Sequence, residues 1–316
     1  MKKDQRWTAD QIPDQSARVA VVTGANSGLG LATARALARR GGHVILAVRD
    51  EAKGRRAAEE ITAEQPGAGL EVRRLDLADL DAVRAFADRI RADHPRLDVL
   101  VNNAGVMAPP RSLSAQGHES QFAANHLGHF ALTGLLLDLL ADGVDPRVVT
   151  VSSANHRQGR LFLDDLSGEK KYSPMGFYNQ SKFANAVFGW ELHRRLTAAG
   201  SPIRSLLAHP GYTATNLQTS APVGRVKVLF GFVLAPLAQR PEKGALPQLY
   251  AATAPEAKGG EFIGPDGIAE LRGHPTRVRL SGEAADPETG RRLWELSERL
   301  TQVRFPLPSP SGRQSP

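Results

Sequence analysis

The stretch that decides the fold is Thr23-Gly24-Ala25-Asn26-Ser27-Gly28-Leu29-Gly30, which ends the apolar run Val19–Thr23 and leads into a helical pattern. Glycine lets the backbone turn tightly and approach a ligand closely. The helix that follows offers N–H groups and the positive end of its dipole to an anion. A glycine triplet alone is a weak indication, but between a first strand and a first helix it predicts a turn that binds a pyrophosphate.

Short apolar runs alternate with helical patterns along the chain, and the runs are continuously apolar, as in strands that are covered on both faces. The predicted strands are Val19–Thr23, His43–Val48, Leu70–Leu75, Leu97–Val101, Arg147–Ser152, Ile203–Ala208 and a weaker one near Glu261–Ile263. The predicted helices include Leu29–Arg40, Glu51–Glu64, Leu80–Asp93, Glu119–Leu140 and Phe177–Ala199. This alternation predicts an α/β fold: a doubly wound (Rossmann) parallel sheet of about seven strands, with helices on both faces, in a single domain.

The expected domain organisation is an N-terminal arm (1–16), a catalytic domain (17–305) and a Pro/Ser-rich disordered tail (306–316). Residues 213–240 break the strand–helix alternation and carry apolar side chains. They are interpreted either as a substrate lid or as a core helix, because a lid is itself apolar on one side.

Composition excludes several classes of protein. The chain has no cysteine, which excludes disulfides, zinc–thiolate sites and thiol nucleophiles. The most apolar stretch, Val226–Ala238, includes Lys227 and Pro236 and is shorter than the roughly 20 residues of a spanning helix. We therefore expect a cytoplasmic protein without a membrane anchor. The net charge of +7 comes from scattered arginines without interleaved aromatics, so no nucleic-acid partner is expected.

The second predicted strand ends in Ala47-Val48-Arg49-Asp50, which bears on the choice of cofactor. An acidic side chain at this strand tip binds the ribose 2′-hydroxyl of NAD, whereas an arginine accommodates the 2′-phosphate of NADP. Arg49 suits that phosphate, because a guanidinium makes bidentate, charge-assisted contacts. Asp50 is the alternative ribose ligand, but it directly precedes a helical run and is better explained as an N-cap. We therefore predict NADP(H).

Tyr178 and Lys182 are four residues apart at the start of a predicted helix, so they lie on one helix face. A phenol has an ordinary pKa of about 10. A nearby ammonium is expected to lower this pKa, as a general acid/base requires. Ser153 lies at the end of the fifth predicted strand, with Ser152 as its rival. Residues 159–176, called the insertion below, separate these serines from the tyrosine.

Several motifs between about Val19 and Gly267 resemble the short-chain dehydrogenase/reductase family, and in particular its bacterial branch similar to retinol dehydrogenases. They are the glycine turn with its G-x3-G-x-G spacing, Leu75-Asp76-Leu77, Asn102-Asn103-Ala104-Gly105, Ser153, Tyr178 with Lys182, and His209-Pro210-Gly211-Tyr212-Thr213. The resemblance, rather than the spacing, selects Ser153 over Ser152.

The resemblance implies roles for these residues. Tyr178 would act as general acid/base, Lys182 would also hold the nicotinamide ribose, and Ser153 would position the substrate oxygen. Asn125, in Asn125-His126-Leu127-Gly128, would support a proton-relay water; the alternative is a helix-interior amide bonded to backbone. The implied cofactor-binding residues are Gly24, Asn26, Ser27, Gly28, Leu29, Gly30, Arg49, Asp76, Leu77, Asn103, Ala104, Gly105, Tyr178, Lys182, Pro210, Gly211, Thr213 and Thr215.

His126, His129, His156 and His209 are interpreted as structural, and the absence of metal-ligand spacing predicts no catalytic metal. The predicted function is the NADP(H)-dependent interconversion of a carbonyl and an alcohol on a small, apolar molecule. Two alternatives are a catalytically silent NADP-binding sensor and a C=C reductase. The resemblance also implies a possible homo-oligomer, formed through the helices around Asn125 and Tyr178.

Overall fold

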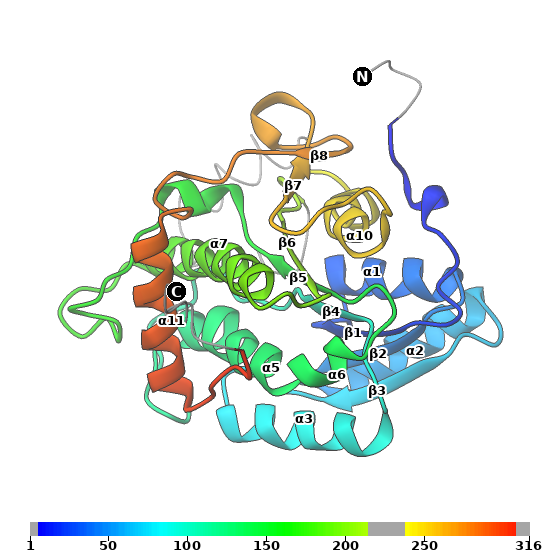
Figure 1. Ribbon diagram of the computed structural model, residues 1–316, viewed down its shortest axis with the longest axis horizontal. Helices are drawn as coiled ribbons and strands as arrows, with labels where there is room; N and C mark the ends of the chain where they lie inside the picture. The colour runs from blue at the N-terminus through cyan, green and yellow to red at the C-terminus, as the bar shows by residue number, and fades with distance from the viewer. Residues whose placement is uncertain (1–5, 214–237, 308–316) are drawn as a thin grey trace, which may run out of the picture.

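The computed structural model describes residues 6–213 and 238–307 (Figure 1). Eight strands within these ranges form one sheet in the order β3-β2-β1-β4-β5-β6-β7-β8. They are β1 (Val19–Thr23), β2 (His43–Val48), β3 (Leu70–Arg74), β4 (Val99–Asn102), β5 (Arg147–Val151), β6 (Arg204–Ala208), β7 (Phe262–Pro265) and β8 (Pro275–Arg277). The first seven pair in parallel. The predicted doubly wound sheet is therefore confirmed.

The eighth strand was not predicted. β8 runs antiparallel to β7 at the edge of the sheet, where Pro265 pairs with Pro275 and Ile263 with Arg277. It has three residues, begins with a proline and contains no apolar run. A strand of three residues is too short to show a periodic pattern. At the edge of a sheet it also tolerates proline, because only one side of it pairs with another strand.

Helices cover both faces of the sheet. They are α1 (Gly28–Arg39), α2 (Glu51–Glu64), α3 (Leu80–Asp93), α4 (Ser120–Phe122), α5 (Gly128–Leu135), α6 (Leu137–Ala141), α7 (Pro174–Ala198), α9 (Pro241–Gly244), α10 (Leu246–Thr253) and α11 (Pro287–Thr301). Short 3₁₀ turns are η1 (Ala9–Gln11), η3 (Ala154–Gln158) and η7 (Ile268–Glu270). One apolar cluster joins the sheet to α1, α2 and α10, and a second joins it to α3, α5 and α7.

The predicted helix Glu119–Leu140 is interrupted. After α4, the backbone forms a π-helical turn, η2 (Ala123–Leu127), and α5 and α6 meet at Leu136, whose φ and ψ of −107° and 5° lie outside the helical region. The apolar pattern of this segment predicted one helix and gave no sign of the π turn or of the break at Leu136. Such turns are frequent at functional sites, and this one contains Asn125.

The described part of the predicted arm, residues 6–16, packs on the domain. Trp7 and Ile12 are buried, and the Trp7 ring meets Tyr250 of α10 edge-on, with centroids 5.4 Å apart. At the other end of the chain, Phe305 is buried in the core. Most of the predicted tail (308–316) and most of the predicted lid (214–237) lie outside the described residues, so both remain predictions.

The outer surface of α5 and α7 is covered by α11 and the segment that follows it, as Figure 1 shows at the C-terminal end of the colour range. The Trp294 ring of α11 lies 5.2 Å from Phe130 of α5 and 4.5 Å from Phe305, between ring centroids. The guanidinium of Arg195 on α7 lies 4.2 Å from the Trp294 centroid. A homo-oligomer through α5 and α7 remains a prediction, and it would have to displace α11 or include it.

None of the helices in the described ranges combines the length and the apolar composition that crossing a membrane requires.

Candidate active site

The glycine turn follows β1 at the carboxyl edge of the parallel strands. Gly24 and Gly28 have φ values of +68° and +55°, which L side chains rarely adopt. A Cβ at Gly30 would lie 2.3 Å from the Gly24 carbonyl oxygen. The side chain of Ser27, the N-cap of α1, makes no capping hydrogen bond, so it leaves the first N–H groups of α1 to another acceptor. This arrangement fits an anion such as a pyrophosphate.

The Asn103–Gly105 segment is fastened to the end of β1. The Thr23 hydroxyl oxygen accepts hydrogen bonds of 2.9 Å from the backbone N–H groups of Asn103 and Ala104. The Asn103 amide donates to the Thr23 carbonyl oxygen at 2.8 Å and accepts from Gln248 of α10 at 3.2 Å. Thr23 and Gln248 were missed as supporting residues. The pairing of β1 with β4 brings Thr23 next to the Asn103–Gly105 segment. That pairing cannot be predicted from the sequence alone.

At the end of β2, the two candidate ligands of the ribose, Arg49 and Asp50, differ in whether their side chains already have partners. Asp50 is the N-cap of α2 and accepts a hydrogen bond from the Lys53 backbone N–H at 3.1 Å, which confirms its interpretation as a cap. This bond also holds the pKa of Asp50 below its ordinary value. Arg49 is exposed, and within residues 6–213 and 238–307 its guanidinium makes no hydrogen bond or ion pair. Its charge is therefore available to a ligand.

Asp76 and Leu77 follow β3 at the same edge of the sheet. The Asp76 carboxylate accepts a hydrogen bond from the backbone N–H of Ala78 at 3.0 Å. Leu77 is buried, and a Cβ at Gly128 would lie 2.2 Å from its carbonyl oxygen. The close approach of α5 therefore fixes the backbone of this pair.

Tyr178 and Lys182 lie one turn apart on α7, which begins at Pro174 behind the N-cap Ser173. Both side chains are buried. Burial raises the pKa of Tyr178 to about 12, and a side-chain hydrogen bond with Ser153 lowers it only in part. The pKa of Tyr178 is thus raised by burial in this structure, rather than lowered as expected from the nearby lysine. The phenol is protonated at neutral pH.

The Lys182 ammonium donates a hydrogen bond to the Val151 carbonyl oxygen at 3.1 Å, where β5 ends. Burial lowers its pKa to about 8. A Cβ at Gly105 would lie 3.5 Å from Lys182 Nζ and 3.2 Å from Asn125 Oδ1. Gly105 therefore leaves the space in which these two side chains approach the Asn103–Gly105 segment.

The side chain of Asn125 binds backbone. It accepts from the Val106 N–H at 2.8 Å and donates to the Val106 carbonyl oxygen and to the Ser181 hydroxyl, both at 2.9 Å. The structure thus shows the backbone-bonded alternative for this amide. Asn125 ties the segment after β4 to α7, next to Lys182, as a positioning residue.

The four histidines that were interpreted as structural are buried, and each has a partner within the described residues. His126 lies against Ser297 and His129 against Thr23, each with 2.9 Å between ring nitrogen and hydroxyl oxygen. Burial lowers their pKa values to about 3 and about 4, so both rings are neutral at physiological pH. His156 Nδ1 lies 2.7 Å from the Ser153 carbonyl oxygen. These contacts agree with structural roles.

His209 belongs to an ion-pair cluster that holds the segment after β6. Its Nε2 lies 2.9 Å from the Glu270 carboxylate, which also binds Arg157 at 2.8 Å. The hydrogen bond from His209, followed by that from Arg157, lowers the pKa of Glu270 to about 2. Glu270 has a φ of +58°, in the left-handed region that a non-glycine residue rarely adopts. Sequence reasoning missed Glu270 and Arg157, because they come from separate loops.

The segment after β6 continues from His209 with three predicted cofactor ligands, Pro210, Gly211 and Thr213. Gly211 has a φ of +66°, and a Cβ there would lie 2.4 Å from the Leu271 carbonyl oxygen. The Thr213 hydroxyl donates to the Pro210 carbonyl oxygen at 3.0 Å. Thr215, the last predicted cofactor ligand, lies outside the described residues.

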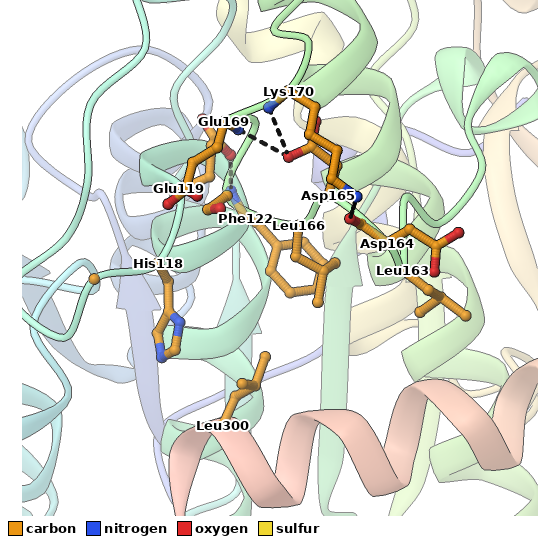
Figure 2. A pocket seen from close by; sticks show the side chains of 12 residues that line it. His118, Glu119, Phe122, Leu163, Asp164, Asp165, Leu166, Glu169, Lys170 and Leu300 are labelled. Atoms are coloured by element: carbon orange, nitrogen blue, oxygen red, sulfur yellow. Dashed lines mark hydrogen bonds between the residues drawn. The ribbon is translucent and has the colours of Figure 1, made fainter.

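The insertion before α7 frames a cavity of about 240 Å³ (Figure 2). Its walls come from the start of α4, from the insertion and from Leu300 of α11. Asp164, Asp165, Glu169 and Lys170 give it a charged lining. None of Ser153, Tyr178 and Lys182 lines it, so this cavity is separate from the candidate catalytic residues.

Comparison with known proteins gives concordant matches. A family model described as short chain dehydrogenase matches residues 18–224. Retinol dehydrogenase 13 of Homo sapiens is 40% identical over 305 residues, covering 95% of this chain and 88% of that protein. A crystal structure of an uncharacterized protein from Mycobacterium paratuberculosis is 47% identical with a TM-score of 0.79, covering 96% of this chain and 100% of that one. A Shigella flexneri 2a short chain dehydrogenase, solved in complex with NADP, is 27% identical with a TM-score of 0.61, covering 81% and 98%.

Proposed function

The chain belongs to the short-chain dehydrogenase family of oxidoreductases, and from this membership we propose that it interconverts a carbonyl and an alcohol with NADP(H), using Tyr178 as general acid/base. The observation that carries the proposal is the buried Tyr178 hydroxyl, whose pKa the Ser153 side chain lowers in part and which lies one helical turn from Lys182. A nicotinamide cofactor supplies or accepts the hydride when it is bound.

The chain's own residues handle the proton. Because the pKa of Tyr178 is about 12, its phenol carries the proton that a carbonyl oxygen needs on becoming an alcohol. Ser153 positions that oxygen next to the phenol. Lys182, which is charged below its pKa of about 8, stabilises the phenolate left behind. Burial excludes water and strengthens each of these interactions.

The same site has residues that fit the cofactor. The Gly24–Gly30 turn, with Asn26, Ser27, Gly28 and Leu29, would hold the pyrophosphate, and Asp76 and Leu77 would contact the adenine. Asn103, Ala104 and Gly105 would border the ribose that Lys182 would bind. Pro210, Gly211, Thr213 and Thr215 would border the nicotinamide. The Shigella flexneri relative was solved with NADP. This supports the phosphorylated cofactor, together with Arg49, which has no ion pair within residues 6–213 and 238–307.

Replacing Arg49 by Asp should reverse the preference from NADP towards NAD. The change removes a charge-assisted contact to the 2′-phosphate, worth about 1.5–3 kcal/mol, and adds a like charge beside it. The measurement is kcat/KM with NADPH and with NADH. The neighbouring Arg55→Asp variant on α2 is the control for net charge and should keep the preference. Equal efficiency of the wild type with both cofactors would contradict the assignment.

Ser153 and Ser152 should differ sharply when each is replaced by Ala. The Ser152 hydroxyl donates to the Lys182 carbonyl oxygen at 2.7 Å, within the packing of α7, whereas Ser153 faces the Tyr178 hydroxyl. We expect Ser153→Ala to lower turnover by about 10²-fold, the cost of one positioned hydrogen-bond donor, with little change in NADPH binding. Ser152→Ala should mainly lower thermal stability. A larger loss of turnover in Ser152→Ala would exchange the two roles.

For the substrate we propose a small, apolar carbonyl compound or alcohol, supported by the similarity to a protein named retinol dehydrogenase. A panel of ketones, aldehydes and alcohols, assayed with NADPH and NADP, tests the proposal. Tight NADPH binding without turnover across the panel would favour a silent sensor. The intact Ser153, Tyr178 and Lys182 argue against that alternative. Reduction of an enone at carbon rather than oxygen would favour a C=C reductase. A cytoplasmic location remains a prediction.

A further inference from the structure

Three metal-ligating side chains meet at the edge of the sheet opposite the candidate active site. His43 is the first residue of β2, Glu71 is the second residue of β3, and His94 directly follows α3. One ligand atom from each lies within 4.8 Å of the other two. The three residues come from separate elements, so the sequence contains no metal-ligand spacing that would indicate them.

The two imidazoles converge on one carboxylate oxygen. Glu71 Oε1 lies 2.7 Å from His43 Nε2 and 3.1 Å from His94 Nε2. A tetrahedral ion with ligand distances of about 2.1 Å would hold such atoms about 3.4 Å apart. The two contacts to Glu71 Oε1 therefore need to lengthen by less than about 1 Å to admit an ion.

Neighbouring groups prepare the three ligands. Arg73 binds the other carboxylate oxygen, Oε2, at 2.9 and 2.5 Å, and so orients Oε1 towards the imidazoles. A Cβ at Gly69 would lie 2.9 Å from His43 Nδ1, so this glycine leaves room for the ring.

Within the described residues, one buried nitrogen of the cluster lacks a hydrogen bond. His94 Nε2 is buried and faces Glu71 without satisfying hydrogen-bond geometry. The His94 side chain is 11% exposed, whereas that of His43 is 35% exposed. A buried nitrogen of this kind costs free energy unless it finds a partner. A cation shared with His43 and Glu71 would supply one, and the exposure of His43 leaves a path from solvent.

We propose that His43, Glu71 and His94 bind a divalent transition metal of the zinc type, with two imidazole nitrogens and one carboxylate oxygen as ligands and a fourth position open to solvent. Nitrogen ligands favour zinc and its neighbours over Mg²⁺ and Ca²⁺, which prefer all-oxygen sites. The ion would join β2, β3 and the end of α3, which lie together at one edge of the molecule (Figure 1).

Such an ion stabilises the fold and takes no part in the chemistry. The candidate cofactor ligand Arg49 follows the other end of β2, about 20 Å from His43 at the usual rise of a strand. The prediction of no catalytic metal concerns a different place in the molecule. An ion that binds only the folded chain raises its stability by mass action.

The test uses the full chain, purified without a histidine tag and treated with a chelator. Calorimetric titration with Zn²⁺ should show one equivalent bound per chain. Co²⁺ should give the intense visible absorption of a four-coordinate ion. The His43→Ala/His94→Ala variant should bind Zn²⁺ about 10²-fold more weakly or worse, and Glu71→Gln should also bind more weakly. Zn²⁺ should raise the Tm of the wild type and leave that of the double variant unchanged.

The matched control is His118→Ala/His193→Ala, which also removes two partly exposed imidazoles but from other parts of the chain. It should bind Zn²⁺ as the wild type does. Far-ultraviolet circular dichroism and turnover equal to wild type confirm that each variant is folded. Zn²⁺ binding that survives in His43→Ala/His94→Ala, or is absent from the wild type, would overturn the proposal.

Discussion

Tyr178→Phe should lower turnover by roughly 10² to 10⁴-fold, the usual contribution of a positioned acid, while NADPH binds with nearly normal affinity. The substitution keeps the buried ring and its packing, but it removes the proton that the phenol holds at neutral pH and the hydrogen bond with Ser153. The measurement pairs steady-state kinetics on the best substrate of the panel with a fluorescence titration of NADPH.

Tyr250→Phe is the matched control. Burial raises the pKa of Tyr250 to about 12 as well, but this tyrosine lies on α10 beside Trp7. It should keep nearly full turnover, which would show that location and not a raised pKa makes Tyr178 the acid. Retention of most activity by Tyr178→Phe would mean that the proton comes from elsewhere, and the central proposal would fail.

Lys182→Met should impair both turnover and cofactor binding, with kcat/KM for NADPH reduced by 10² to 10⁴-fold. Methionine fills most of the lysine stem but removes the ammonium that stabilises the phenolate and holds the ribose. Thermal stability should be equal or higher, since a charge buried at a free-energy cost is gone. The Val151 carbonyl oxygen still accepts from Asn185 at 3.3 Å.

The effects on kcat and on KM for NADPH distinguish the roles of Tyr178 and Lys182. Tyr178→Phe should lower kcat alone, whereas Lys182→Met should also raise KM for NADPH. A Lys182→Met enzyme with a normal KM for NADPH would remove the cofactor role from this lysine and leave only its effect on the proton. Unchanged values of both constants would contradict its place in the site.

The central strands could be predicted because each is a continuous apolar run. β1 and β2 begin and end at the predicted residues. The carboxyl ends of β1, β2 and β4 place the glycine turn, Arg49 and the Asn103–Gly105 segment at one edge of the sheet. What the sequence did not disclose depends on contacts between distant segments. The Thr23 anchor depends on the pairing of β1 with β4, and the contact of Glu270 with His209 joins two loops.

The raised pKa of Tyr178 was also beyond sequence reasoning. The spacing of Tyr178 and Lys182 predicts proximity, and proximity alone predicts a lowered pKa. The opposing effect is burial, which depends on how the segments around α7 close over the phenol. Likewise, Ser152 and Ser153 are adjacent in sequence, and only the direction in which each leaves β5 separates them.

The position of α11 far after α5 and α7 in the chain affects how the protein is made. The ribosome produces residues 287–305 after α5 and α7, so these two helices are synthesised well before Trp294 and Phe305 exist to cover Phe130 and Phe188. Until then the nascent chain carries an aromatic surface that chaperones recognise. A message truncated shortly before codon 287 would encode every candidate catalytic residue. Its product would nevertheless be prone to aggregation and would be degraded quickly.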